Sequence, residues 1–344
     1  MVQPNYDILV SIINYRTADL TIACARSVLE AGLPEPSGGA GQGGHVVIVD
    51  NASGDGSAER IAAWIAEEGL GDRISLVRSP DNAGFSGGHN AGMGFAPAAF
   101  YLILNSDAVL RPGFFDTILT AAWARPEIGL FAPRLEDEDG TPQISAFRFA
   151  GPLSELMRAA QTGVVTRLFR HRVVALSADP QEARIEWASF ACILLRGAMV
   201  ARIGPMDEGY FLYFEDAEYC LRARRAGWRI AAVPAARVVH FRGGSGPVKA
   251  LQKAKKRMPG YFYASRSRFL YQAHGRAGLM LANLLWHMGR GIAHARRLVG
   301  RPAPPAHEGE ARDLWINAFD PLGPRRAPHE LPGAAASALK ETTP

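Results

Sequence analysis

The feature that most constrains this chain is a regular alternation, over its first third, of short β-branched apolar runs with segments of helical periodicity. Strands are predicted at Ile8–Asn14, Val46–Val49 and Ile74–Arg78, with helices at Ala18–Ala31 and Ser57–Glu68 between them. The strands are apolar along their whole length, which is typical of strands covered on both faces. This order predicts an α/β fold with a mostly parallel, Rossmann-like central sheet, right-handed crossovers and flanking helices.

The middle of the chain is less regular. A further strand is predicted at Phe100–Leu104, and residues 142–183 are predicted to form an insertion whose helices shape a pocket. Periodicity predicts a helix at Asp216–Ala226, followed by two short strands at Arg229–Val233 and Val238–Phe241.

The C-terminal part contains an amphipathic helix candidate at Leu279–Val299, with leucines, a methionine and an isoleucine at helical spacing and arginines beside them. Such a helix can pack on its own domain, on a second copy of the chain or on a membrane surface. From Pro302 onward the chain is rich in proline and alanine, and we expect it to be extended or loosely ordered.

Charge is unevenly distributed. The net charge is +5, yet the stretch from Tyr219 to His307 holds 18 Lys and Arg and no Asp or Glu, which leaves 20 basic and 33 acidic residues elsewhere. A block of this length favours an anionic partner, such as a diphosphate, an anionic lipid or nucleic acid, over a merely solvated surface. No recognised nucleic-acid-binding module accompanies it, so nucleic acid is not a predicted partner.

The cysteines and the apolar runs bear on location. Cys24, Cys192 and Cys220 are too far apart for metal-ligand spacing or a disulfide framework, which favours a reducing compartment. Residues 1–13 lack the basic segment and the apolar length of a signal peptide. No apolar run reaches the roughly 18–20 residues that a membrane span needs. We therefore expect a cytoplasmic protein.

Polar clusters follow the predicted strands, and ligands of open parallel sheets bind beyond the carboxyl ends of the strands. After the second strand, Asp50 can accept a hydrogen bond from a base or a ribose, and Asn51 and Ser53 can cap the next helix; capping alone is the alternative. After the third strand, the glycine-rich segment 81–92 can bring backbone N–H groups to a diphosphate, or can be a flexible surface turn. Its glycine spacing does not match a dinucleotide-binding motif.

Two residues are candidate metal ligands. An apolar strand ends shortly before Asp107, where a carboxylate can hold Mg²⁺ or Mn²⁺ and thereby phosphate groups; helix capping is the alternative. His240 ends another apolar strand and precedes a glycine loop, so it can bind a metal or a phosphate, with Arg242 adding positive charge. A lone histidine is usually structural, but the glycines and Arg242 favour a functional one.

An aromatic run, Tyr210–Phe214, leads directly into Glu215, Asp216 and Glu218. Acids in the first turn of a helix complement its dipole, which explains some of these acids but not the aromatic run. A carboxylate beside an apolar floor can be tuned to take a proton from a hydroxyl, and Asp216 is the candidate for that role.

Together these segments resemble the family 2 glycosyltransferases of the GT-A fold, and among them the bacterial rhamnosyltransferase-like branch. The resemblance runs from Ile8 to about Gly275, and the order and spacing of its motifs are jointly specific although each motif alone is weak. The motifs are Val10–Tyr15, Val49–Ser53, Asn82–Phe85 with Asn90, Leu104–Asp107, Glu215–Asp216 with Glu218, and His240 with Gly243–Ser245.

The resemblance implies an inverting glycosyltransferase that uses a nucleotide-sugar donor and Mg²⁺ or Mn²⁺, with Asp216 as the catalytic base and Asp107 and His240 as metal ligands. We predict a donor site made of Ile13, Asn14, Tyr15, Asp50, Asn51, Asn82, Gly84, Phe85, Asn90, Asn105, Ser106 and Arg242. We predict an acceptor site made of Glu215, Glu218, Tyr213 and Trp187.

By branch resemblance the donor is dTDP-L-rhamnose, with a UDP-sugar as the alternative, and the acceptor is a cell-surface glycan or its lipid-diphosphate-linked precursor. The basic stretch and the helix at Leu279–Val299 suit such an acceptor and a peripheral contact with the anionic inner membrane face. Packing of that helix on the domain or in a homodimer is the alternative.

One departure from the family pattern concerns the metal. Many relatives carry Asp-x-Asp where this chain has Asn105, Ser106 and Asp107, so a second metal ligand is in question, and His240 can supply it. The departure leaves open an inactive module that binds nucleotide-sugar or glycan without transfer. A nucleotidyltransferase is a further alternative, although residues 14–17 lack the glycines typical of that class.

The predicted domain organisation follows from these assignments. Residues 1–245 form the GT-A catalytic domain, residues 246–300 form a basic helical extension, and residues 301–344 form a Pro/Ala-rich tail. Within the catalytic domain, the nucleotide-binding half covers about 1–110 and the acceptor-binding half about 111–245.

Overall fold

The computed structural model describes residues 5–35, 43–241 and 248–328, and these form two compact units. The first unit consists of Met1–Phe147, Ala175–Met206 and Tyr219–Gly246, and the second of Arg148–Val174, Asp207–Glu218 and Pro247–Pro344. In the described residues, no helix is both long enough and apolar enough to cross a bilayer.

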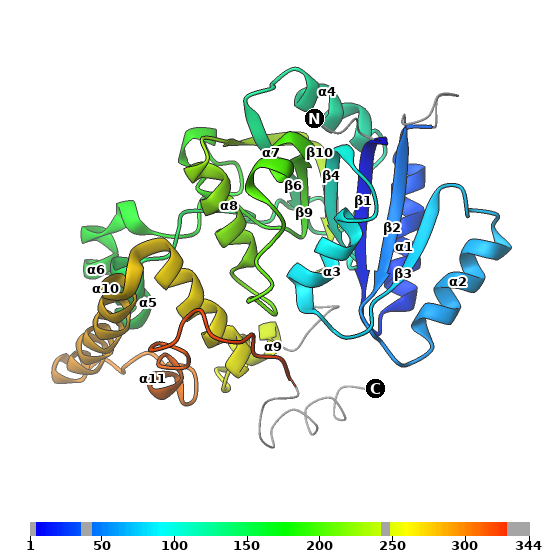
Figure 1. Ribbon diagram of the computed structural model, residues 1–344. Helices are drawn as coiled ribbons and strands as arrows, with labels where there is room; N and C mark the ends of the chain where they lie inside the picture. The colour runs from blue at the N-terminus through cyan, green and yellow to red at the C-terminus, as the bar shows by residue number, and fades with distance from the viewer. Residues whose placement is uncertain (1–4, 36–42, 242–247, 329–344) are drawn as a thin grey trace. The chain divides into compact units, whose positions relative to one another are not determined.

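The first unit is built on one large sheet with the strand order β3-β2-β1-β4-β9-β6-β10-β5 (Figure 1). Strands β1 to β4 are mutually parallel, as are β6 and β10, whereas β9 and β5 run antiparallel to their neighbours. The predicted mostly parallel α/β sheet is therefore confirmed. The strands of this sheet are β1 (Tyr6–Asn14), β2 (Gly44–Asp50), β3 (Ile74–Arg78), β4 (Ala98–Asn105), β5 (Ala108–Leu110), β6 (Ile128–Glu136), β9 (Cys192–Arg196) and β10 (Arg229–His240).

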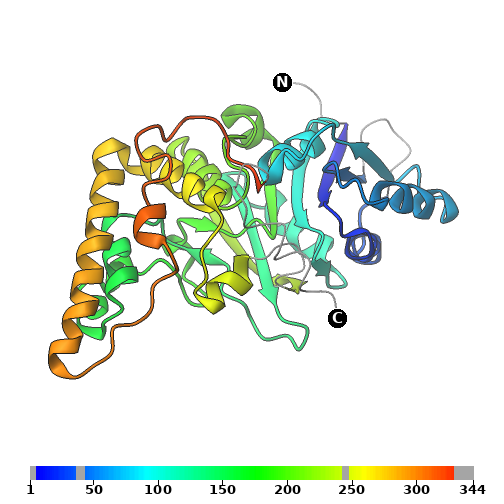
Figure 2. The same cartoon turned by 90° about the horizontal axis from the view of Figure 1, so that it is seen from below.

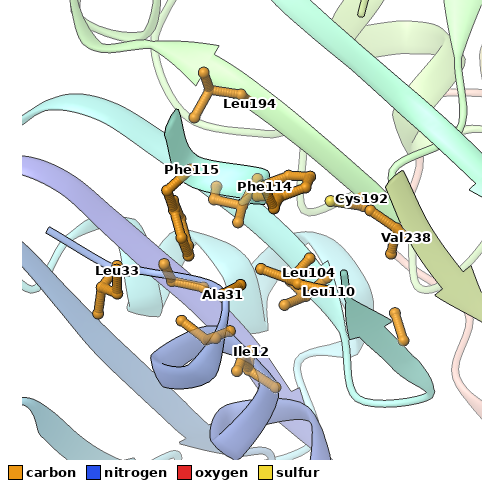
Figure 3. Close-up of a cluster of buried hydrophobic side chains, with 14 of the residues drawn as sticks. Ile12, Ala31, Leu33, Leu104, Leu110, Phe114, Phe115, Cys192, Leu194 and Val238 are labelled. Carbon is orange, nitrogen blue, oxygen red and sulfur yellow. The ribbon is translucent and has the colours of Figure 1, made fainter. Parts of the chain in front are cut away.

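One face of this sheet is covered by α1 (Ala18–Glu30), α2 (Ser57–Glu67) and α4 (Phe114–Trp123), whose apolar residues join those of the strands in one buried cluster. Figure 3 shows part of this cluster, with Ile12 of β1 and Leu104 of β4 near the aromatic rings at the start of α4. Burying each such side chain completely stabilises the folded state by roughly 1.5–3 kcal/mol relative to leaving it exposed.

The other face of β1 receives α3 (Gly84–Met93), and glycines set how closely the helix approaches. A Cβ atom at Gly92 would lie 2.2 Å from Ser11 Oγ, and one at Gly88 would lie 2.7 Å from Ile13 Cδ1. These two glycines of the segment 81–92 therefore serve helix–sheet packing, a role that differs from the predicted close approach to a diphosphate.

The two strands predicted at 229–233 and 238–241 are in fact one strand, β10, and that prediction was wrong. Its pairing with β6 shifts register between Val233 and Arg237. Pro234 lies in that interval and has no N–H to donate, so the irregularity accommodates it without ending the strand. The smaller elements of this unit are β7 (Ala146–Phe147), β8 (Trp187–Ala188), η2 (Glu182–Arg184), α7 (Gly197–Ile203) and most of α8 (Glu215–Arg225).

The second unit is helical, and its longest element, α10 (Gly260–Ala295), bends at Gly275, where φ is +70°. The helix predicted at 279–299 forms the second half of α10 and the short η3 (Arg296–Val299). Figures 1 and 2 both show α5 (Pro152–Ala160) running alongside this half. The remaining elements are α6 (Gly163–Leu168), η1 (Arg170–Arg172), α9 (Val248–Ala254) and α11 (Glu310–Asp313).

The chain from Pro302 onward was expected to be extended or loosely ordered. Residues 302–307 form no helix or strand, but the prediction fails beyond them, where α11 forms and the chain is packed. Leu314 and Ala318 are fully buried, and Asn283 of α10 donates a hydrogen bond to the Leu314 carbonyl at 3.0 Å. A few apolar residues inside a Pro/Ala-rich stretch are enough to anchor it, which overall composition does not show. Residues 329–344 lie outside the described part of the chain.

Buried ion pairs join the helices of the second unit. Glu155 of α5 accepts hydrogen bonds from Arg158 and Arg266, both at 2.8 Å, and Arg158 also pairs with Glu310 of α11. Arg266 in turn donates to Asn283 at 2.8 Å, which ties the two halves of α10 together. Burial alone would raise the pKa of Glu155, but the charges of the two arginines outweigh it and bring that pKa down to about 2.

Because the folded state lowers the pKa of Glu155, its stabilising contribution is present above the unfolded pKa and is lost as the pH falls towards 2. Glu155→Gln should lower the free energy of unfolding by about 3–5 kcal/mol at pH 7, since Arg266 is left buried without its partner. The difference in the free energy of unfolding between this variant and the wild type should become smaller between about pH 5 and pH 2. Urea unfolding across this pH range measures the difference at each pH, with the exposed Glu68→Gln as control. A difference that does not change with pH would contradict the expectation.

Candidate functional site

Residues from three strand ends meet at one edge of the large sheet in the first unit. In the parallel register, Asn14 at the end of β1 lies opposite Asp50 of β2, and Ile13 lies opposite Asn105 of β4. Segments far apart in the sequence are thus neighbours at the carboxyl ends of parallel strands, where ligands of such sheets bind.

Asp50 is the centre of a buried hydrogen-bond cluster. Its Oδ1 accepts from Asn14 Nδ2 and from Ser53 Oγ, both at 2.6 Å, and its Oδ2 accepts from the Ser53 backbone N–H at 3.2 Å. Ser53 Oγ also accepts from the backbone N–H of Arg16 at 3.0 Å. The carboxylate therefore fixes the loops after β1 and β2 to each other, and Tyr15, which is 40% exposed, is held at their rim.

Asn51 connects the same edge to the start of α3. Its Nδ2 donates to Asn82 Oδ1 and to the Gly84 carbonyl, both at 3.0 Å, and its Oδ1 accepts from the Ala83 N–H at 3.1 Å. Gly84 has φ of +71°, which favours glycine there. Asn51 and Asn82 thus shape the loop that starts α3.

Two other predicted donor-site residues lie on α3. Asn90 exchanges two hydrogen bonds of 2.9 Å with the backbone of Met206, so its amide joins α3 to that segment. Phe85 is half-buried, and its ring packs edge-on against His89 with centroids 4.5 Å apart. Burial lowers the pKa of His89 to about 3, so this imidazole is neutral.

Asp107 and His240 are brought together by an antiparallel strand pair. In β5 and β10, Ala108 lies opposite His240, and the Phe241 N–H donates to the Asp107 carbonyl at 3.0 Å. His240 Nε2 consequently lies 3.5 Å from Asp107 Oδ1. The Asp107 side chain is almost fully buried and that of His240 is 11% exposed. Ser106, also buried, has its Oγ 3.4 Å from Thr17 Oγ1 in the loop after β1.

Gln143 holds His240, and sequence reasoning missed it. Its Nε2 donates to the His240 carbonyl at 2.8 Å and to Asp137 Oδ1 at 2.6 Å, while its Oε1 lies 3.3 Å from His240 Nδ1. A histidine protonated on Nδ1 donates to Oε1 and presents the lone pair of Nε2 on the Asp107 side. Gln143 belongs to no motif in the sequence, so no signal points to it.

The strand that carries His240 is anchored by a second group that sequence reasoning missed. Glu136 is fully buried and accepts from Arg237 Nε at 2.8 Å and from Arg111 Nε at 3.0 Å. Burial would raise the pKa of Glu136, but hydrogen bonds from the two arginines hold it below its usual value. The ionised carboxylate thereby locks β10 and the segment after β5 close to His240.

In the second unit, the aromatic run is fastened to the first half of α10. Asp207 accepts from Arg268 Nε and Nη2 at 2.8 and 2.9 Å and from Gln272 Nε2 at 2.9 Å, and the Tyr210 hydroxyl bonds to Gln272. Gly209 lies so close to Arg268 that a Cβ there would come within 2.1 Å of its guanidinium carbon. Residues 207–218 therefore take their conformation from this helix.

Tyr213 and Phe214 are strained. Their φ angles are +72° and +69°, a region that costs a side-chain-bearing residue about 1–2 kcal/mol. The ring of Phe214 stacks on Phe269, and the rings of Tyr213 and Phe214 both contact Phe262, so aromatic packing offsets the strain. Such strain concentrates at functional sites.

Helix α8 begins directly after these residues with Glu215 and Asp216. Glu215 is buried, and no group in the described part of the chain hydrogen-bonds to its Oε2. Burial, and then the charge of Asp216, raise the pKa of Glu215 well above its usual range. Asp216 is half-buried and its Oδ1 accepts from the Ala217 N–H at 2.8 Å. Glu218, one turn further on, is also buried.

Two predicted site residues remain. Trp187 belongs to the first unit, where its ring stacks on Phe147 with centroids 4.2 Å apart in the small β7–β8 sheet. Arg242 lies outside the described residues, as does the glycine loop that follows it.

The residues at the strand ends fit a divalent metal that is shared with a phosphate ligand. Across 5–35, 43–241 and 248–328, no group of three or more His, Cys, Asp or Glu has a metal-binding arrangement. Asp107 and His240 supply one carboxylate and one imidazole. Mg²⁺ and Mn²⁺ beside nucleotides commonly take one or two protein ligands and complete their coordination with phosphate oxygens and water.

Comparison with protein families gives one match that covers most of the chain. The model of the glycosyltransferase like family 2 matches residues 24–259. The chain is 27% identical over 212 residues to N-acetylglucosaminyl-diphospho-decaprenol L-rhamnosyltransferase of Mycobacterium tuberculosis, which is 58% of this chain and 63% of that protein. The chain thus spans less than two thirds of the length of this relative. It is also 37% identical over 57 residues to rhamnosyltransferase WbbL of Escherichia coli, or 17% and 22% of the two chains.

Solved structures show the same fold. The mannosyltransferase PcManGT from Pyrobaculum calidifontis, in complex with GDP-Man and Mn²⁺, aligns with a TM-score of 0.54 at 16% identity, over 94% of this chain and 83% of that one. GalNAc-T7 with UDP, GalNAc and Mn²⁺ aligns with a TM-score of 0.52 at 14% identity, over 87% and 58%. At these identities the likeness establishes the GT-A fold.

The assignment of Asp107 and His240 as metal ligands is a prediction that a binding measurement can test. If both bind the metal, His240→Ala should raise the Kd for Mn²⁺ by about 10-fold or more, because one of the two predicted protein ligands is lost, and Gln143→Leu should raise it by about 10-fold by releasing the imidazole. Electron paramagnetic resonance titration of Mn²⁺ in the presence of a nucleoside diphosphate measures both. The exposed Gln181→Leu is the matched control. An unchanged Kd in His240→Ala would exclude His240 as a ligand.

Proposed function

The chain belongs to the glycosyltransferase like family 2, and on that premise we propose that it is an inverting glycosyltransferase that moves one sugar from a nucleotide-sugar to an acceptor hydroxyl. One observation carries the proposal: the Asp107–His240 pair lies at the ligand-binding edge of a parallel sheet. The fold and the family identify the chain as a glycosyltransferase, and this pair would hold the metal that neutralises the leaving diphosphate.

The donor site takes its shape from the loops at the strand ends. We assign contacts with the nucleoside to Asp50 and to the segment Ile13–Tyr15, because the hydrogen-bond cluster around Asp50 holds these loops in one conformation. Asn51, Asn82 and Asn90 would act by shaping α3 and its preceding loop. A preorganised site of this kind loses little conformational entropy when the donor binds.

The metal would be held by Asp107 and His240, next to Ser106 and Asn105. When bound, Mg²⁺ or Mn²⁺ supplies positive charge against the diphosphate that leaves as the sugar is transferred. The described GT-A neighbours whose structures contain Mn²⁺ are consistent with that assignment.

We assign the base to Asp216. The acceptor oxygen forms a bond to the anomeric carbon as the bond from that carbon to the diphosphate oxygen breaks, and the hydroxyl proton passes to Asp216. Attack from the face opposite the nucleotide inverts the anomeric configuration. Glu215 is buried whereas Asp216 is partly exposed, which favours Asp216 as the member of the adjacent pair that meets the acceptor hydroxyl. We assign the acceptor to the acidic segment, with Glu215, Glu218 and Tyr213 as predicted contacts, and keep Trp187 of the first unit as a further predicted contact.

For the substrates, we propose dTDP-L-rhamnose as the donor and a lipid-diphosphate-linked glycan as the acceptor, in cell-surface glycan synthesis. The rhamnosyltransferase names of the mycobacterial and Escherichia coli relatives support this choice. The UDP and GDP-Man bound by structural neighbours keep a UDP-sugar as the alternative donor. An inactive binding module would retain donor affinity but release no nucleoside diphosphate.

The base assignment makes a specific prediction. Asp216→Asn should lower turnover by about 100-fold or more, while the Kd for the donor stays near that of wild type, because only the proton acceptor is removed. Glu208→Gln, in the same segment, is the control and should retain activity. Turnover near wild type in Asp216→Asn would remove Asp216 from this role.

A donor panel tests the substrate. Purified protein is incubated with dTDP-L-rhamnose, UDP-sugars and GDP-mannose in the presence of Mg²⁺ or Mn²⁺, and the released nucleoside diphosphate is measured with and without a lipid-diphosphate acceptor. We expect acceptor-dependent release of dTDP. Release from none of the donors under any condition would favour the inactive module, and release of UDP would correct the donor.

A further inference from the structure

The second half of α10 has two very different faces. One face packs within its own unit through Leu279, Ala282, Trp286 and Gly289, all buried. At Gly289 the contact with α5 is so close that a Cβ would lie 2.6 Å from the Leu156 carbonyl oxygen. The predicted packing of this helix on its own domain therefore holds for this face only.

The opposite face is apolar and exposed. Leu281, Leu284 and Met288 are 48%, 58% and 50% exposed, and we call these three residues the apolar ridge. They follow one another at helical spacing, and between Arg276 and Arg290 the helix carries no charged residue at all. A helix that faces water normally carries charges on its outer side, so a continuous uncharged ridge indicates a surface that something apolar covers.

Basic residues bracket the apolar ridge. Arg276 begins this half of the helix, and Arg296 and Arg297 follow its end, both on the exposed or half-exposed surface. The helix lies within the long stretch that has no acidic residue. An apolar strip on a helix with cations at both ends is the pattern of a helix that lies in the interface of an anionic membrane.

A basic pocket adjoins the same helix. It has a volume of about 620 Å³ and lies between α10 and the segment before α11. Its basic lining residues are Arg257, His287, Arg290, His294, His307 and Arg312. These groups already have partners within the unit: Arg257 and Arg312 pair with Asp313, and Arg290 donates to the Ala159 and Pro304 carbonyls. Trp286, which also lines the pocket, belongs to the packed face of the helix, so the pocket is not part of the exposed surface that carries the apolar ridge.

From these observations we infer that the second half of α10 is a membrane-docking surface, in which the apolar ridge enters the acyl-chain boundary of an anionic lipid layer and the arginines at the two ends of the helix meet its headgroup phosphates. The helix covers about 30 Å at 1.5 Å per residue, so it can lie along the surface while its other face stays packed on α5. Vesicle binding and sugar transfer can be measured separately, so either can fail without the other.

A second copy of the chain is a poorer occupant for this ridge. In a two-fold symmetric pair the same patch meets itself, so antiparallel ridges would bring Arg276 of one copy close to Arg296 and Arg297 of the other. Like charges without intervening acids oppose that arrangement, whereas an anionic lipid surface neutralises the same arginines.

Flotation of the full chain with vesicles tests the surface. The protein should float with vesicles of phosphatidylcholine and phosphatidylglycerol in equal parts, should not float with phosphatidylcholine alone, and should be released by raised salt. Leu281→Asp/Leu284→Asp should weaken vesicle affinity by at least about 10-fold. Arg296→Gln/Arg297→Gln, at the end of the helix, should weaken it several-fold.

Ile144→Asp is the matched control, because Ile144 is 46% exposed but belongs to the other unit. It should float like wild type, and all variants should keep the wild-type thermal unfolding and the wild-type Kd for the nucleoside diphosphate. Absence of flotation, equal flotation of the ridge variant and wild type, or equal binding to both lipids would overturn the docking surface. The docking surface would also be overturned if the wild type sedimented as a dimer and Leu281→Asp/Leu284→Asp sedimented as a monomer.

Discussion

The candidate site depends on the pairing of two short antiparallel segments, β5 and β10, at the edge of an otherwise mostly parallel sheet. This pairing returns the chain to Asp107 after more than a hundred residues and sets His240 beside it. The ion pairs from Arg111 and Arg237 to the buried Glu136 fix the same edge. Breaking an ion pair to a buried carboxylate is costly, so this edge of the sheet resists fraying. The relative positions of Asp107 and His240, the two proposed metal ligands, are thus fixed by the fold itself.

The second unit contributes a different constraint, which is a strained backbone that is stabilised by aromatic packing. Tyr213 and Phe214 adopt left-handed backbone angles immediately before Glu215 and Asp216, and rings from α10 keep them there. The C-terminal helix is thus more than an extension of the catalytic part of the chain. Its first half determines the conformation of the acidic segment, whereas its second half presents the apolar ridge.

The sequence predicted the parallel sheet and the polar strand ends, because continuous apolar runs followed by Asp or Asn are local signals. It could not predict Gln143, whose role arises from a tertiary contact with His240 and leaves no local pattern. It predicted two strands where β10 is one, because Pro234 suggests a break that a register shift absorbs. Gly88 and Gly92 correctly indicate a close approach of the backbone to another group. The structure shows that this group is strand β1.

The replacement of the usual first aspartate by Asn105 is consistent with this architecture. Asp107 is almost fully buried, and a second carboxylate two residues away would place two negative charges in a site of low polarity, where each raises the free energy of ionising the other. A neutral Asn105 removes that repulsion, and His240 offers a nitrogen ligand without adding negative charge. In the proposed site the metal would therefore be held by one carboxylate and one imidazole. Gln143, whose Oε1 lies 3.3 Å from His240 Nδ1, would fix the orientation of that imidazole, which makes a residue outside every sequence motif part of the proposed metal site.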